Sequence, residues 1–90
     1  MNNSETIVKN YMNDDLIFML PKKRSCLIEV LTYIANKIPA GELSETDINA
    51  QIQRVISFPD YVSVRRDLVD FAFFKRTDDG RVYEKIQQPK

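Results

Sequence analysis

The chain has 90 residues, of which 43% are hydrophobic and 29% charged, and 13 basic residues balance 13 acidic ones. This length allows one domain with a modest core, and the composition is that of an ordinary globular protein. The sequence has no histidine and a single cysteine, Cys26, which excludes histidine-dependent catalysis, an intramolecular disulfide and a metal site built on cysteines. The paired acids 14–15 and 78–79 resemble turns. We therefore expect no enzyme, no metal and no cofactor.

The N-terminus is polar, and no apolar run approaches the length of a membrane span. We therefore expect a cytoplasmic protein with no membrane partner. A short helix is predicted over about 5–12, with several possible caps in Asn2-Asn3-Ser4, and residues 13–15 break it. This helix could pack across the domain or form a dimer seam. The apolar run 16–20 could be a strand or a buried extended segment.

The clearest helical pattern runs from Leu27 to Ile38, with apolar residues spaced three and four apart. Pro21 is placed to begin this helix, and Pro39 and Gly41 to end it. Lys22-Lys23-Arg24 would then lie in the first turn, where positive charge opposes the helix dipole. This basic cluster is either a phosphate contact or a solvated charge run.

A third helix follows the capping-box-like stretch 44–47 and is expected to reach about Val55, after a small strand near Glu42-Leu43. Asp60 is a plausible N-cap for a helix over 61–72. Residues 73–85 then suit a β-hairpin around the turn signal at 78–80. In that hairpin, one of Phe73 and Phe74 should be buried and the other more exposed.

This order of elements predicts a small α+β winged helix that occupies residues 1–90 as a single domain. It would have a three-helix core, a C-terminal β-hairpin as the wing and an extra N-terminal helix. In such domains a helix enters a DNA groove and the hairpin lies beside it. Helix 61–72 would be the recognition helix, and hairpin 73–85 the wing.

The chain also resembles an uncharacterised bacterial family, the domain-of-unknown-function family number twenty eighty-seven. The matching stretches are Leu20–Arg24, Leu43–Asn49, Val64–Asp70 and Lys75-Arg76 with Gly80 and Tyr83. The resemblance implies a winged-helix-like fold and a role in transcriptional regulation, without an established activity or site. Where the family pattern has a glycine after the third helix, this chain has Ala72. A left-handed cap costs more for alanine than for glycine, so the exit into the wing could differ.

A shorter similarity concerns Val64-Arg65-Arg66-Asp67-Leu68, which looks like the recognition helix of DeoR-type repressors. These observations give a set of candidate DNA-binding residues: Lys22, Lys23, Arg24, Tyr61, Ser63, Arg65, Arg66, Arg76 and Arg81. Arginine suits contacts to guanine edges and to phosphates. The alternative pairs Arg65 or Arg66 with Asp67, Asp70 or Glu45 in surface ion pairs.

Charge does not decide between these partners. Residues 1–60 carry six basic and eight acidic residues, whereas residues 61–90 carry seven and five. The leading hypothesis is a DNA-binding or transcription-regulatory module whose partner is double-stranded DNA. The alternative is a protein-interaction module on a winged-helix scaffold, with a protein partner or a homodimer. A continuous basic face would support DNA, and interleaved charges would support a protein partner.

Overall fold

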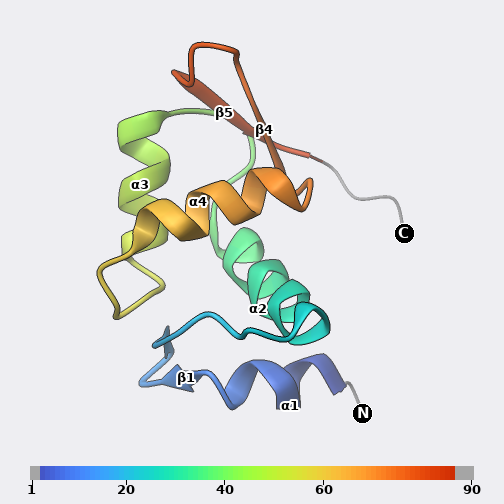
Figure 1. Ribbon diagram of the computed structural model, residues 1–90. Coiled ribbons are helices and arrows are strands. Elements are labelled where there is room, and N and C mark those ends of the chain that lie inside the picture. The colour runs from blue at the N-terminus through green and yellow to red at the C-terminus, as the bar shows by residue number, and fades with distance from the viewer. Residues whose placement is uncertain (1–2, 87–90) are drawn as a thin grey trace.

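The computed structural model describes residues 3–86, with side chains from residue 6 onward, so the ends of the predicted domain (1–2 and 87–90) lie outside it. Within the described residues the fold is mixed α+β, as expected, with four helices and two small antiparallel sheets. The elements, shown in Figure 1, are α1 (Asn3–Lys9), β1 (Met12–Asn13), β2 (Leu16–Ile17), α2 (Arg24–Lys37), β3 (Glu42–Ser44), α3 (Glu45–Gln53), α4 (Tyr61–Asp70), β4 (Phe74–Arg76) and β5 (Val82–Lys85).

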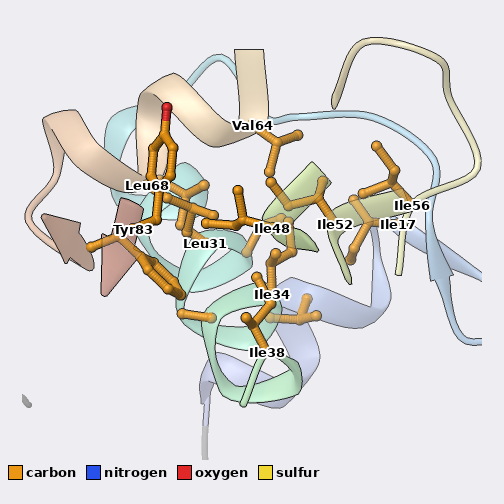
Figure 2. Packing of buried hydrophobic residues seen from close by; sticks show 14 residues of the cluster. Ile17, Leu31, Ile34, Ile38, Ile48, Ile52, Ile56, Val64, Leu68 and Tyr83 are labelled. Carbon is orange, nitrogen blue, oxygen red and sulfur yellow. The ribbon is translucent and has the colours of Figure 1, made fainter. Parts of the chain in front are cut away.

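The hydrophobic core joins α2, α3 and α4 to both sheets. Its members are Val8, Ile17, Val30, Leu31, Ile34, Ala35, Ile38, Ile48, Ile52, Ile56, Val64, Leu68, Phe74 and Tyr83. Figure 2 shows Ile17 and Ile56 at one end of this cluster and Leu68 and Tyr83 at the other. Each fully buried large aliphatic side chain contributes roughly 1.5–3 kcal/mol. Because α4 and the C-terminal sheet share this core, the core fixes how they face each other.

The start of α2 differs from the prediction. The helix begins at Arg24 with Lys23 as N-cap, and Lys23 makes no side-chain capping bond. Pro21 lies before the helix and is itself buried, so its ring packs in the interior rather than supplying the first helical residue. Lys22 and Lys23 consequently precede the helix, and only the charge of Arg24 lies in its first turn.

The N-terminal segment forms a small hairpin that the sequence did not predict. The first helix ends at Lys9, short of the expected position 12, and strand β1 pairs with β2 across Asp14 and Asp15. Both turn residues have positive φ, 52° and 67°, as a two-residue type I′ turn requires. The extended run expected over 16–20 is a strand only at Leu16–Ile17. The proposed caps at 2–4 lie outside the residues whose side chains are described.

This N-terminal hairpin (β1–β2) is attached to the link between α3 and α4. Ile17 forms a parallel bridge with Ile56. The Ile17 N–H donates to the Val55 carbonyl at 2.9 Å, and the Ser57 N–H donates to the Ile17 carbonyl at 2.8 Å. A segment that precedes α2 is therefore held by residues that follow α3.

The predicted start of α3 is confirmed, because the Ser44 hydroxyl accepts a hydrogen bond from the Asp47 N–H at 3.0 Å. The helix ends at Gln53, two residues before the expected Val55. Val55 instead begins the link that receives the N-terminal hairpin. The apolar stripe continues past the helix because Val55 and Ile56 still pack on the core.

The predicted N-cap of α4 is also confirmed. Asp60 Oδ1 accepts from the Ser63 N–H at 3.1 Å, and the Ser63 hydroxyl donates to Asp60 Oδ2 at 2.7 Å. These bonds, the hydroxyl bond first, lower the pKa of Asp60 below its ordinary value.

Helix α4 ends at Asp70, two residues before the expected Ala72, in a left-handed cap. Ala72 has φ +65°, the Phe73 N–H donates to the Leu68 carbonyl at 2.8 Å, and the Ala72 N–H donates to the Val69 carbonyl at 3.0 Å. These two bonds define a Schellman motif. An alanine in this conformation costs roughly 1–2 kcal/mol relative to a right-handed one. The chain therefore keeps the sharp exit from α4 without the glycine that usually permits it.

The C-terminal sheet has the order β3-β5-β4, so the last strand lies in the middle. Tyr83 of β5 is paired with Leu43 of β3 on one side and Arg76 of β4 on the other. The strand expected near 42–43 is confirmed as β3. Phe74 is buried and Phe73 only partly so, as the alternation along a strand predicted. The predicted hairpin 73–85 is present as β4 and β5 (the C-terminal hairpin), and it projects from the end of the molecule opposite α1 (Figure 1).

Candidate functional site

An open pocket of about 470 Å³ lies between α4, the C-terminal hairpin and the start of α3. Its lining consists of Glu45, Arg65, Arg66, Val69, Asp70, Arg76, Asp79, Gly80 and Tyr83. Three of the nine predicted DNA-binding residues, Arg65, Arg66 and Arg76, meet here although they come from a helix and a separate strand. This α4–hairpin pocket is the best candidate for a functional site.

The Arg65 side chain is held by contacts to two neighbouring elements. Its Nη1 donates to Asn49 Oδ1 at 2.6 Å, and its Cζ lies 5.9 Å from the centre of the Tyr83 ring. A guanidinium at that distance is attracted to the aromatic face. The side chain is half-buried and connects α4 to both α3 and β5. Arg65 therefore adds contacts that link α4 to α3 and to the C-terminal hairpin, beyond the core that these elements share.

Arg66 and Arg76 are both exposed, one on each side of the pocket. Among the described residues, no ion-pair or hydrogen-bond partner contacts the Arg66 side chain. Arg76 Nη1 reaches the Thr77 carbonyl at 3.4 Å, a long and weak bond. The same nitrogen would lie 3.5 Å from a Cβ built on Gly80, so the guanidinium follows the hairpin turn. These two cations remain available to an anionic group.

Acidic side chains also line the pocket, which weakens a purely electrostatic case for nucleic acid. Asp79 is held by the hairpin turn: it accepts from the Thr77 hydroxyl at 2.6 Å and from the Arg81 N–H at 3.1 Å. These bonds, in that order, lower the pKa of Asp79. Arg81 Nε also lies 3.8 Å from Asp79 Oδ2. Asp70 is exposed at the last residue of α4.

Asp67 lies on α4 beside these groups and is half-buried. Burial and, secondarily, the charge of Asp70 raise the pKa of Asp67, while Arg66 acts in the opposite direction. The ion pairs that the sequence offered for Arg65 and Arg66, with Asp67, Asp70 or Glu45, do not occur within 4.0 Å.

The other predicted contact residues lie outside the pocket lining. Tyr61 and Ser63 are in the first turn of α4, where Ser63 serves the Asp60 cap. Arg24 stacks over Phe71, the C-cap residue of α4, at 5.1 Å from the ring centre. Lys22 and Lys23 are exposed in the segment that leads into α2.

Asn49 holds Arg65 in place but is not among the site residues predicted from sequence. Asn49, the partner of Arg65, lies 16 residues before it on α3. No spacing rule relates two residues on different helices, so the sequence contains no local signal for this bond. Tyr83 is 4% exposed and belongs to the core, yet its ring faces Arg65 and its hydroxyl end points away from the cluster in Figure 2.

Residues 3–86 contain neither a candidate membrane span nor a candidate metal site. No helix in this part of the chain is long and apolar enough to cross a membrane. No group of three or more acidic or cysteine side chains is arranged there to hold a metal ion.

Comparison with known proteins identifies a family for this chain. A family model described as "Uncharacterized protein conserved in bacteria (DUF2087)" matches residues 17–85, which include α2 to α4 and the whole C-terminal sheet. No curated protein and no solved structure matches the chain significantly.

Proposed function

We propose that this chain, which belongs to the DUF2087 family of uncharacterised proteins conserved in bacteria, binds duplex DNA as a winged-helix module. Helix α4 would lie in a groove as the recognition helix, and the C-terminal hairpin would lie along the backbone as the wing. Such a module would act in transcriptional regulation.

The topology supports the winged-helix part of this proposal. A strand between the first and second core helices joins the edge of the C-terminal hairpin, and the last strand lies in the middle of the resulting sheet. The third core helix, α4, leads directly into that hairpin. This connectivity places a helix beside a two-stranded arm, which is the arrangement that a DNA-reading helix and its wing would require.

The observation that carries the DNA part is the outer face of α4. Val62 and Arg66 are exposed one helical turn apart, and Arg66 borders the pocket that Arg76 closes from the hairpin. An arginine can bind guanine edges or phosphates, and an aliphatic side chain can contact a thymine methyl group. The face is thus chemically suited to a groove.

A second candidate function, binding to a protein, is favoured by the interleaved charges. Glu45, Asp70 and Asp79 line the same pocket as the three arginines. Phe18 and Met19, which follow the N-terminal hairpin, are 41% and 42% exposed, and a protein partner could cover them.

Titration with a mixed-sequence duplex, followed by backbone amide NMR at low and at physiological salt, tests the proposal. We expect amides of residues 61–67 and of the hairpin strands to shift together, with weaker binding at the higher salt. Arg66→Ala should weaken binding by about 1–3 kcal/mol if Arg66 contacts a base.

Lys9→Ala is the matched control, because it also removes one positive charge. Lys9 is exposed in α1, at the end of the molecule opposite the C-terminal hairpin. It should leave binding nearly unchanged. If the duplex causes no shift even at low salt, the DNA function is wrong. Shifts confined to residues 16–20 would also contradict it.

A further inference from the structure

The faces of strand β4 separate two neighbouring cations. Lys75 and Arg76 are adjacent, so their side chains leave the strand on opposite sides. Lys75 Nζ lies 3.3 Å from Glu84 Oε1, on the neighbouring strand to which it is paired. Arg76 lines the α4–hairpin pocket instead. The hairpin therefore directs only one of these charges toward α4.

Of the three arginines that line the pocket, one is held by neighbouring side chains and two are not. Arg65 is occupied by Asn49 and Tyr83, whereas Arg66 and Arg76 approach from different elements with little to hold them. The hairpin turn carries Asp78 and Asp79, whose charges would be repelled by the walls of a narrow minor groove. Contact with DNA is therefore expected along the arm of the hairpin and not at its tip.

We propose that the α4–hairpin pocket seats one backbone phosphate of a DNA strand, bound jointly by Arg66 and Arg76. This inference rests on the proposed function, and it assigns Arg65 a different role: Arg65 is a positioning residue that holds α4 at the separation the phosphate requires. A guanidinium presents several N–H donors in a plane, so two of them can surround a phosphate from two sides.

Removing an acidic charge from the pocket should have opposite effects on binding to DNA and on binding to a cationic protein. Arg81 and the Thr77 hydroxyl already engage Asp79, which leaves Glu45 and Asp70 as the exposed, unpaired carboxylates of the pocket lining. Asp70 would repel a phosphate and attract a cationic protein segment. Asp70→Asn should therefore tighten binding to DNA, whereas it would weaken binding to a cationic protein partner.

The experiment measures the affinity of a short mixed-sequence duplex for the full chain over a series of salt concentrations by fluorescence anisotropy. Arg66→Ala and Arg76→Ala should each weaken binding and reduce the slope of log affinity against log salt by about one. The double variant should lose less than the product of the two single losses, because both arginines bind the same phosphate. Lys75→Ala, next to Arg76 on the opposite face, should leave the slope unchanged.

Separate outcomes identify which proposal fails. If the wild-type chain does not bind the duplex at low salt, both the DNA function and the proposed phosphate site are wrong. Suppose instead that the wild type binds with a clear salt slope. If Arg76→Ala then behaves like Lys75→Ala, or if Asp70→Asn weakens binding, only the proposed phosphate site is wrong. Arg65→Lys separates positioning from contact: it keeps the charge but loses the planar donors, so it should weaken binding and also shift the Asn49 side-chain amide resonances in the DNA-free protein.

Discussion

The molecule contains two hairpins that are stabilised in different ways. The N-terminal hairpin has strands of two residues, and backbone bonds of Ile17 to Val55 and Ser57 attach it to the body. The C-terminal hairpin has a turn built by its own side chains. The Thr77 hydroxyl accepts from the N–H groups of Arg81 and Val82 at 3.3 and 3.2 Å while it donates to Asp79.

The difference indicates what each hairpin can be used for. An element whose order depends on docking cannot move away from the body without losing its structure. The C-terminal hairpin is anchored in the core by Phe74 and Tyr83, and the side-chain bonds of its turn let the tip keep its shape where it projects beyond that core. A DNA-contacting arm would require this property.

The largest effect is expected from removing the side chain that docks the N-terminal hairpin. Ile17 is fully buried, so Ile17→Ala should lower the free energy of unfolding by about 2–5 kcal/mol. The neighbouring substitution Phe18→Ala is the control, because Phe18 is 41% exposed and should cost much less. Chemical denaturation followed by circular dichroism measures both. Equal losses for the two variants would mean that the hairpin is not held through Ile17.

A smaller and local effect is expected in the C-terminal hairpin. Thr77→Ala removes the hydroxyl that joins three residues of the turn, at a cost of roughly 0.5–1.5 kcal/mol. Hydrogen exchange should accelerate at the amides of Arg81 and Val82 and stay unchanged at Ile17. Thr77→Ser keeps the hydroxyl and should restore slow exchange. Unchanged exchange in the alanine variant would show that the turn does not depend on this hydroxyl.

The smallest effect concerns pH and separates three aspartates. Hydrogen bonds lower the pKa of Asp60 and Asp79 from 3.8, so their stabilisation is present above that value and is lost as pH falls through the lower folded value. Burial raises the pKa of Asp67 above 3.8, so its charge opposes folding near neutral pH, and this cost is relieved first on acidification. Carboxyl carbon NMR should show Asp67 titrating at the highest pH of the three. A titration of Asp79 above Asp67 would contradict the bonding of the turn.

The parts of the fold that could be predicted from sequence are those with a long period or a local side-chain bond. Helix α2 has four turns of repeating apolar residues, and the caps Ser44 and Asp60 act within three residues of themselves. Strands of two residues are too short for an alternating pattern, so the N-terminal hairpin was missed. The start of α2 was misplaced because the rule for proline at a helix start does not consider that Pro21 could be buried.

For the candidate site, sequence reasoning could name the cations and not their roles. Arg65 and Arg66 are adjacent and look equivalent in the sequence. Their difference depends on Asn49 and Tyr83, which reach Arg65 only through the packing of α3 and β5 against α4. The side of the strand on which Arg76 emerges depends in the same way on the register of β4 with β5.

The attachment of the N-terminal hairpin also has a consequence for synthesis of the chain. Ile17 and its partner Ser57 are 40 residues apart, and the ribosome produces the N-terminal end first. Ile17 must therefore emerge before its docking surface exists, and it stays undocked until the link after α3 has followed. Closing a loop of this length adds only a modest entropy cost, so the separation of the two partners along the chain does little to weaken their docking.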